Sequence, residues 1–501
     1  MFSRARGLWS VEGNLRKRKR KLPFRFGARS PFCVRSGRTR SVGPRCAHER
    51  AMSAAVLLDV SHSCRCGCTE RLLREEAAAH AHSHLFVLCA GGVRSDATDA
   101  LVCAWSGEGM CVLLDWRATA ACAYRLKQAA DEVSAISLRV ITSPRGRARL
   151  LRYERALFTA LYTFTYRLGC GADGPGREVD DDVTAFLQRL PAVGGAVRLL
   201  TSSLIPDCFG HGFSTRVGGV SRVPTLSSLN LFSSPSRRDS AAVVHENRRR
   251  LALHAGFYPR PLQMLKVRAE VVIAVSRPLQ HSGRPFWQAT LVSHSCRSSG
   301  QVQHSSRVWV LGKAEPDRYD AAVTDRPGTV LAAPGADCIP MIFADPVAKA
   351  IAVAHAGWRG TLRGVAAATV SAMTTELGCV CANILVVLGP SVGPCCFTLE
   401  PEQAARFHPN CIQRSQCHRP NVDIRLANRL QLEETGILPH HIHDDASVTT
   451  PCTSCHPQDF FSHVRDGAHF GTQVGFVWLK EGAGTASAAA RSVTEASPGQ
   501  H

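Results

Sequence analysis

Cys338 and His355 are the two residues whose types and surroundings most directly suggest chemistry. Cys338 lies in the stretch GADCIP and His355 lies in VAHAGWRG. A thiolate and an imidazole at the ends of neighbouring apolar runs are ligand types of a zinc site, and a catalytic zinc site combines three protein ligands with an open position. The pair therefore predicts a metal site whose third ligand must come from elsewhere in the chain.

Short apolar runs and tight turns are expected to position this pair. TVLAAPGADC and IPMIFAD read as buried strands on either side of Cys338, and AIAVAHAG as a third strand that ends at His355. A helix is expected over residues 361–377, and ILVVLGPSVGPCCF reads as a fourth strand followed by a Gly/Pro turn. Upstream, Asp239 is expected to cap an amphipathic helix that ends near Ala255. This mixture predicts a layered α/β (α+β) domain with its site at strand ends.

The region before this domain is expected to be a smaller α/β domain. LFVLCAGG and LRVITS read as strands, and residues 150–168 and 181–190 read as helices. No catalytic constellation is found there, so a scaffolding or regulatory role with protein partners is expected. The expected divisions of the chain are a leader, the small domain, the larger domain and a disordered tail: 1–51, 52–195, 196–480 and 481–501.

The net charge of +20 is concentrated near the amino terminus. Residues 1–51 carry 15 Lys and Arg side chains against Glu12 and Glu49, so the remainder has the charge of an ordinary enzyme and no nucleic-acid partner is expected. The leader reads as a disordered extension, a nuclear address or an organelle presequence. The folded part is expected to begin at Met52.

The 21 cysteines are spread along the chain rather than framed in a small domain. This usage favours a reduced cytoplasmic setting, with nuclear or organelle association left open by the leader. No apolar stretch approaches the roughly 20 residues that span a bilayer, so no membrane span is expected.

Three short cysteine motifs are interpreted as non-ligating. CRCGC is too tightly spaced for the usual zinc-finger pattern. PCTSCH has the letters of a haem attachment motif, but its cysteines are expected to be buried or weakly redox-active. GPCCF is expected to pack or to line the pocket. Their cysteines are Cys64, Cys66, Cys68, Cys395, Cys396, Cys452 and Cys455.

Seven motifs carry a family resemblance: HGFSTRVGG, SLNLF, ENRRRL, GADCIP, AHAGWRGTLRGV, LGPSVGPCCF and FFSHVRDG. In this order they resemble the YfiH-type laccase-domain family of multicopper polyphenol oxidoreductases. The resemblance covers residues 196–480 and implies a YfiH-like mixed-sheet catalytic domain. The additional domain over 52–195 is similar to the layout of vertebrate members.

The resemblance implies one zinc-type site of two histidines and a cysteine, together with purine nucleoside chemistry. Cys338 and His355 match two ligands, and His304, in VQHSSRVWVLGK, matches the third. The implied reactions are phosphorolysis of adenosine, inosine, guanosine and methylthioadenosine, with phosphate as co-substrate, and deamination of adenosine. The open coordination position would activate a water that can attack C6 of adenine.

Three polar residues of these motifs are candidates for substrate binding. Arg216, in the STR turn, and Arg465, in HVRDG, are expected to gather phosphate, and Asn230, in SLNLF, is expected to contact substrate. The alternatives are surface ion pairs for the two arginines and a backbone contact in a turn for Asn230.

The sequence departs from the family pattern near the third ligand. Ser305 follows His304 where bacterial members usually have Gly, and Thr472 replaces the late Arg of their GRQ motif, which puts a phosphate role there in doubt. Residues 267–301 intervene directly before His304, and a structureless loop of that length is uncommon in a compact domain. We hypothesise a retained intron or a gene-model error, the alternative being a tolerated surface loop.

Two other functions stay open at this point. A thiolate and two imidazoles also suit copper, so a copper-dependent polyphenol oxidase would use the same residues. Alternatively, the protein is a metabolic or immune signalling scaffold that acts through residues 52–195, in which case Cys338→Ala leaves its role intact.

Overall fold

The computed structural model describes residues 53–60, 66–80, 83–89, 105, 111–115, 119–171, 179–267, 306–413, 418–445 and 451–481. The leader, Cys64, the segment 268–305 with His304 and Ser305, and the tail from residue 482 lie outside the described residues. Among the helices within these stretches, none is long and apolar enough to cross a bilayer.

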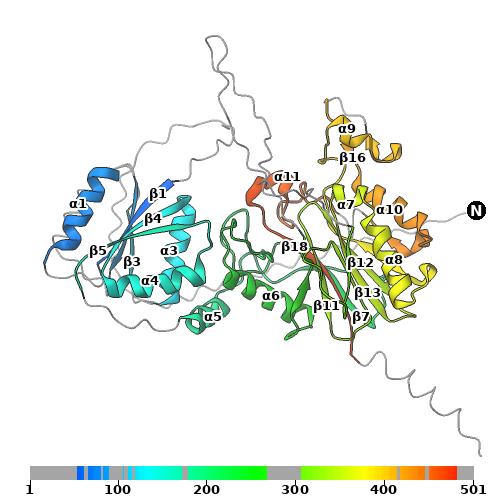
Figure 1. Ribbon diagram of the computed structural model, residues 1–501, viewed down its shortest axis with the longest axis horizontal. Coiled ribbons are helices and arrows are strands. Elements are labelled where there is room, and N and C mark those ends of the chain that lie inside the picture. The colour runs from blue at the N-terminus through cyan, green and yellow to red at the C-terminus, as the bar shows by residue number, and fades with distance from the viewer. Residues whose placement is uncertain are drawn as a thin grey trace, which may run out of the picture. The chain divides into compact units, whose positions relative to one another are not determined.

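Residues 53–190 hold a five-stranded sheet in which every neighbouring pair is parallel, in the order β3-β2-β1-β4-β5 (Figure 1). Ala55 and Leu57 pack on one face with α3 and α4, whereas Val56 and Leu58 pack on the other face with α1. Such two-sided burial is typical of parallel sheets. The elements are β1 Ser53–Asp59, α1 Cys68–His80, β2 His84–Cys89, β3 Cys111–Asp115, α3 Ala120–Glu132, β4 Ala135–Thr142, α4 Pro144–Leu157, β5 Thr163–Leu168 and α5 Asp180–Arg189.

The prediction of one helix over residues 150–168 is wrong in its second half. The helix α4 begins earlier, because Ser143 accepts a hydrogen bond from the Gly146 N–H and Pro144 occupies the first turn. It ends at Leu157, and the alternating β-branched and aromatic residues of TFTYRL form strand β5 beside β4. The helix predicted over 181–190 is confirmed as α5.

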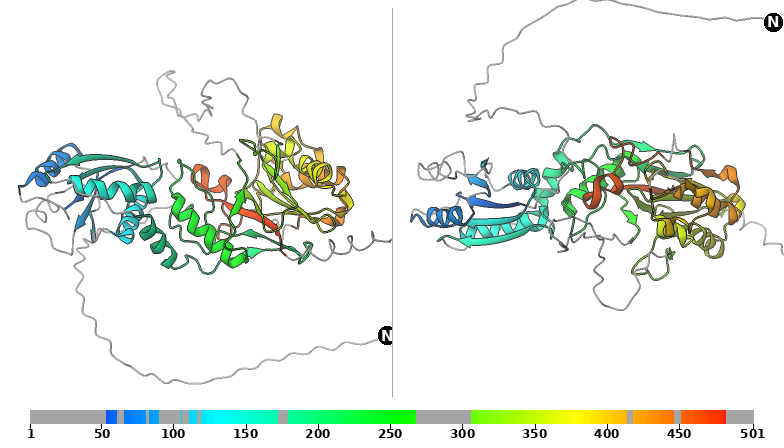
Figure 2. Two further views of the ribbon diagram at one scale, coloured as in Figure 1. Left: turned by 60° about the horizontal axis from the view of Figure 1, so that its bottom comes forward. Right: turned by 90° about the horizontal axis from the view of Figure 1, so that it is seen from above.

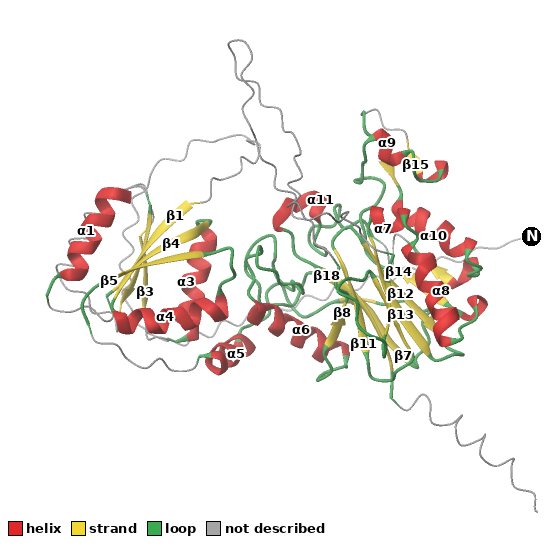
Figure 3. Ribbon diagram, viewed as in Figure 1, coloured by secondary structure: helices red, strands yellow, loops and turns green. Residues whose placement is uncertain are grey.

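Residues 199–481 form two mixed sheets, in the orders β17-β14-β12-β13-β10-β9 and β6-β7-β18-β11-β8 (Figure 3). A third, two-stranded sheet pairs β15 with β16. The strands are β6 Leu199–Leu200, β7 Phe209–Ser214, β8 Leu262–Met264, β9 Val308–Val310, β10 Ala321–Thr324, β11 Val330–Gly335, β12 Ile339–Asp345, β13 Ala350–Ala356, β14 Leu385–Leu388, β15 Ile412–Gln413, β16 Asn421–Val422, β17 Ile442–His443 and β18 Gln473–Leu479. The helices are α6 Ala241–Ala255, α7 Trp358–Leu362, α8 Val365–Leu377, α9 Pro401–Ala404, α10 Ile424–Glu434 and α11 His463–Asp466.

The two larger sheets pack face to face, and helices cover their outer faces. The shared core contains Phe213 and Val477 from one sheet and Ile342 and Val353 from the other. Helices α8 and α10 contact the outer side of β12 and β13, and α6 covers β11 and β18. Figure 1 labels α8 and α10 beside these strands, and Figure 2 shows them from two further directions. The layered α/β prediction is confirmed.

Two local predictions in this region need correction. The residue that caps α6 is Ser240, which accepts from the Val243 N–H, whereas the neighbouring Asp239 points into a buried network. The single helix expected over 361–377 is two helices, α7 and α8, because Gly364 lies between them with φ of 71°. The strands predicted on either side of Cys338 and up to His355 are confirmed as β11, β12 and β13.

Candidate functional site

Antiparallel pairing of β12 with β13 brings Cys338 and His355 together. Pro340 lies opposite His355 in this register, and Cys338 precedes β12 by one residue. The two side chains are close enough to interact electrostatically. A Cβ on Gly357 would lie 2.9 Å from the Cys338 Sγ and 4.0 Å from the His355 Cε1. Gly357 thus leaves the space that both side chains share.

Asp320 orients the imidazole of His355. Its Oδ1 lies 3.3 Å from the His355 Nδ1, and its carbonyl oxygen accepts from the His355 N–H at 2.7 Å. Metal-binding histidines commonly use one ring nitrogen for a carboxylate and the other for the metal, so Nε2 is the nitrogen available for a ligand. Asp320 was not predicted from the sequence, because its proximity to His355 depends on the pairing of β10 with β13.

The surroundings of His355 favour its protonated form. Burial alone would lower the pKa of His355, but attraction to Cys338 and hydrogen bonds to Asp320 and Cys338 raise the pKa to about 10. A metal ion that binds here must displace this proton, because imidazole ligates only in its neutral form.

Asp337 fixes the turn that carries Cys338. Its φ is 89°, a left-handed conformation that is costly for a residue with a Cβ. Its carboxylate accepts from the Thr453 Oγ1 and from the Val464 N–H, both at 2.6 Å, and its carbonyl oxygen accepts from the Val392 N–H at 3.0 Å. Two loops and the first turn of α11 therefore hold the turn in place. This role of Asp337 was not predicted from the sequence.

The third expected ligand, His304, lies outside the described residues. Three residues later, the Arg307 carbonyl oxygen accepts from the backbone N–H groups of Asp320 and Ala321, at 3.2 and 3.3 Å. Arg307, which follows His304 by three residues, therefore contacts Asp320, the residue that orients His355.

Arg216 and Arg465 lie together in the wall of one cavity of about 630 Å³. Two more arginines, Arg198 and Arg222, also line it. Burial is the largest cause that lowers the pKa of Arg216, and the positive charge of Arg465 adds to it. A cavity with this excess of guanidinium groups is suited to an anion.

Both arginines also stabilise the loops around them. Arg216 donates to the carbonyl oxygens of Ser227, Pro224 and Pro457, at 2.7 to 2.8 Å. Arg465 donates to the Thr453 carbonyl oxygen at 2.9 Å and forms an ion pair with Asp466. Since Thr453 also donates to Asp337, it connects Arg465 of the cavity wall to the turn of Cys338.

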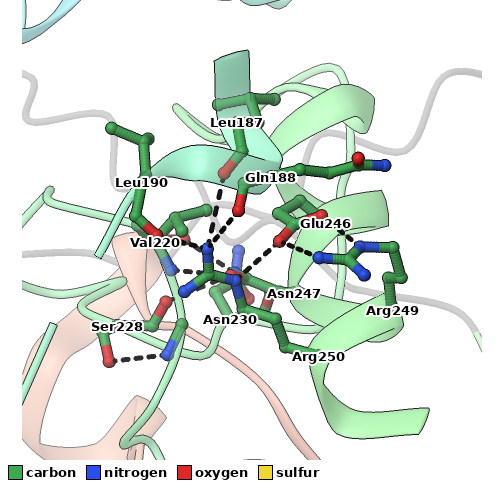
Figure 4. Close-up of polar contacts among 12 residues, drawn as sticks. Leu187, Gln188, Leu190, Val220, Ser228, Asn230, Glu246, Asn247, Arg249 and Arg250 are labelled. Carbon is green, nitrogen blue, oxygen red and sulfur yellow. Dashed lines mark hydrogen bonds and ion pairs between the residues drawn. The ribbon is translucent and has the colours of Figure 1, made fainter. Parts of the chain in front are cut away.

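Asn230 is fully buried in a polar network (Figure 4) and is not among the residues that line this cavity. Its Nδ2 donates to Asp239 at 2.9 Å, and its Oδ1 accepts from the Thr472 N–H at 3.1 Å. Asn247 of α6 donates to the Asn230 carbonyl oxygen at 2.8 Å. These contacts give Asn230 a structural role, so we leave it out of the substrate site.

Thr472, which stands at the position of the family's late arginine, is also part of this packing. Its Oγ1 accepts from the Nη1 of Arg237 at 2.8 Å. Arg237 lies over the ring of Phe470, with 4.2 Å from its Cζ to the ring centroid, and burial lowers the pKa of its guanidinium to about 10. An arginine from another segment therefore reaches this position.

The short cysteine motifs, which were predicted not to bind a metal, gather into two clusters that could hold one. Cys395 and Cys396 of GPCCF meet Cys452 and Cys455 of PCTSCH, with all four sulfurs within 4.8 Å of one another. Only Cys452 is buried, whereas Cys395 and Cys455 are exposed. A second group joins two cysteines of CRCGC to one far along the chain: Cys66, Cys68 and Cys170.

Comparisons with known proteins agree with the motifs. The family model for multi-copper polyphenol oxidoreductase laccase matches residues 210–480. Purine nucleoside phosphorylase LACC1 of Homo sapiens is 46% identical over 382 residues, which cover 72% of this chain and 80% of that protein. LACC1 of Mus musculus is 41% identical, over 86% of this chain and 100% of that protein. Purine nucleoside phosphorylase YlmD of Geobacillus stearothermophilus is 31% identical, over 54% of this chain and 90% of that protein. The chain therefore belongs to the multi-copper polyphenol oxidoreductase laccase family.

Proposed function

We propose that this protein is a metal-dependent purine nucleoside phosphorylase with inorganic phosphate as its co-substrate. The observation that carries the proposal is the connection of the Cys338–His355 pair, through Asp337 and Thr453, to the wall of an arginine-lined cavity. The names of the relatives, purine nucleoside phosphorylases in two mammals and a bacterium, support the substrate class.

The proposed metal ligands are His304, Cys338 and His355, with zinc as the preferred ion. The donor set fits zinc, since it offers a thiolate and an imidazole whose other nitrogen faces the Asp320 carboxylate. A zinc ion with three protein ligands acts as a Lewis acid and activates water near neutral pH. Asp320 holds the tautomer of His355, and Asp337 holds the position of Cys338.

The proposed role of Arg216 and Arg465 is to bind phosphate. In phosphorolysis a phosphate oxygen forms a bond to C1′ of the ribose, the bond from C1′ to the base nitrogen breaks, and the base leaves with a proton. Guanidinium groups bind phosphate oxygens in charge-assisted hydrogen bonds and so can hold the phosphate beside C1′. Their bonds to backbone carbonyls hold them ready for this task.

The proposed substrates are adenosine, inosine, guanosine and methylthioadenosine, each giving the base and ribose 1-phosphate or its methylthio derivative. We also propose deamination of adenosine, in which water replaces the amino group at C6 and ammonia leaves. A reducing compartment such as the cytoplasm would keep Cys338 reduced and available to a metal.

A copper-dependent oxidation of phenols is the competing function, and the family's description favours it. Liquid chromatography of inosine incubated with the full chain and phosphate separates the two. Our proposal predicts hypoxanthine and ribose 1-phosphate in equal amounts, and inosine from adenosine in a parallel reaction. Hypoxanthine from inosine and inosine from adenosine should both be absent with Cys338→Ala. Both should persist with Cys208→Ala, because Cys208 is a half-buried cysteine of the same region outside the proposed site. Copper-dependent oxidation of a phenol without base release would refute the proposal.

A scaffolding role through residues 52–195 would give a different pattern. In that case Cys338→Ala would leave the cellular role intact even though it abolishes turnover in the purified protein. Cells that carry only Cys338→Ala test this alternative.

A further inference from the structure

Four cysteine sulfurs converge at a point separate from the Cys338–His355 pair. Cys395 and Cys396 lie in the turn after β14, and Cys452 and Cys455 lie in the loop after β17. The Cys455 Sγ lies 3.6 Å from the Cys395 Sγ and 3.4 Å from the Cys396 Sγ. Both members of the adjacent pair therefore face the same partner.

These separations are those of ligands around one ion. Tetrahedral zinc with bonds of about 2.3 Å to sulfur places its four sulfurs about 3.8 Å apart. A disulfide instead requires about 2.05 Å between two sulfurs. The measured separations lie near the tetrahedral value, and all four sulfurs lie within 4.8 Å of one another.

The backbone around the cluster is arranged for thiolates. The Gly393 N–H donates to the Cys452 Sγ at 3.3 Å. A Cβ on Gly393 would meet the Arg425 Nη2 at 3.1 Å, the Cys395 Sγ at 3.2 Å and the Cys452 Cβ at 3.3 Å. Gly393 thus leaves room beside its Cα for both the Arg425 guanidinium and the Cys395 sulfur. The positive charge of Arg425 would offset part of the negative charge that four thiolates and a divalent ion carry together.

We propose that Cys395, Cys396, Cys452 and Cys455 bind a structural zinc ion as a tetrathiolate. Four thiol protons leave to solvent as four zinc–sulfur bonds form, and no electron is transferred. Soft thiolate donors in a tetrahedral set select zinc over hard cations. Two exposed sulfurs, those of Cys395 and Cys455, give the ion a path of entry.

The zinc ion would brace the turn of Cys338. It joins the segment of Ser391 and Val392 to the loop of Cys452 and Thr453, which already meet through the Thr453 N–H and the Ser391 carbonyl oxygen at 3.0 Å. From these same segments, Val392 and Thr453 donate to Asp337, which precedes Cys338. The site therefore links metal binding at the cluster to the geometry of the catalytic turn.

Metal analysis of the full chain, purified under reducing conditions, tests the proposal. We expect one zinc equivalent beyond the metal held by the Cys338 site. The variant Cys396→Ser/Cys455→Ser should lose this equivalent and keep the other, whereas Cys338→Ala should do the reverse and Cys208→Ala should change neither. Unchanged zinc in Cys396→Ser/Cys455→Ser would overturn the proposal, whatever the activity proves to be.

A second measurement covers the case in which the double variant does not fold. The wild-type chain reconstituted with cobalt should show the intense charge-transfer absorption of a tetrathiolate, and Cys338→Ala should show it as well. Titration of the thiols after denaturation without reductant should find all four cysteines free. Absence of the tetrathiolate spectrum, or a disulfide between any two of the four, would overturn the proposal.

Discussion

The amino-terminal sheet and the two sheets that follow it use their strand ends in opposite ways. In the parallel sheet, Asp59 at the end of β1 accepts from the Thr142 Oγ1 at the end of β4, at 2.8 Å, and both residues are buried. This is the crevice where such sheets usually bind ligands. Here the crevice is occupied by α4. Its Gly146 packs against Thr142 so tightly that a Cβ at this position would lie 2.0 Å from the Thr142 Oγ1.

In the two-sheet region, strand ends present reactive groups instead. Cys338 precedes β12, His355 lies at the end of β13, and Asp320 precedes β10. Their polar atoms face one another and leave capacity for a ligand, whereas the carboxylate of Asp59 is used by its own sheet. Polar side chains at strand ends therefore stabilise the fold in the amino-terminal sheet and form a candidate site in the two-sheet region.

Cys338→Ala should have the largest effect on activity. Loss of a metal ligand should lower the phosphorolysis rate by at least about 1000-fold, which exceeds the 10- to 100-fold typical of an outer partner. Initial rates with inosine and phosphate measure this loss. If Cys338→Ala keeps the wild-type rate, Cys338 takes no part in the reaction. The strand ends of the two-sheet region would then not differ from those of the amino-terminal sheet in carrying a site.

Two variants of Asp337 separate the effect of its carboxylate hydrogen bonds from the effect of its left-handed backbone conformation. Asp337→Ala should lower activity by about 100-fold, because it loses both carboxylate bonds and strains an alanine at positive φ. Asp337→Asn should retain part of the activity, since Asn tolerates this conformation and keeps one acceptor. Equal activity of the two variants would contradict a bracing role.

Asp320→Asn should weaken metal binding by about 10-fold, within the range observed for partners of ligating histidines. Competition with a chelator measures the affinity, and circular dichroism checks that the fold is intact. Unchanged affinity would show that the carboxylate beside His355 does not tune the site.

Thr142→Val tests the opposite region. It leaves the buried Asp59 without this donor and should lower the free energy of unfolding by about 2 kcal/mol. Denaturant titration measures the change, and the phosphorolysis rate of the folded variant should stay that of the wild type. A comparable loss of rate would mean that the amino-terminal sheet contributes to the chemistry.

His211 should give the smallest effect, confined to acidic pH. Burial lowers its pKa to about 4, and its Nε2 accepts from the Ser202 N–H at 2.9 Å, which requires the neutral ring. The unfolded chain binds the proton with a pKa near 6.5, so stability falls as pH drops from 6.5 towards 4. Between pH 7 and 5 the loss should be about 2 kcal/mol. His211→Gln should remove this part of the pH dependence, and an unchanged pH profile would contradict the assignment.

The strands that carry Cys338 and His355 could be predicted from the sequence, because both residues end apolar runs whose length is that of buried strands. Asp320 and Asp337 could not be found in this way, since each is a single acid whose role depends on register and on loops far along the chain. The four-cysteine cluster was missed for the same reason: Cys396 and Cys452 meet only because the segment of Ser391 pairs with that of Cys452. At residues 163–168 the β-branched and aromatic residues favour a strand, and the prediction of a helix there did not take this propensity into account.

Metal reconstitution tests whether phosphorolysis depends on zinc bound by Cys338. The full chain is stripped of metal, given zinc or copper, and assayed for hypoxanthine released from inosine with and without phosphate. We predict release that requires zinc and phosphate together and that is absent in Cys338→Ala under every condition. Base release that is independent of metal, or unchanged in Cys338→Ala, would contradict the account.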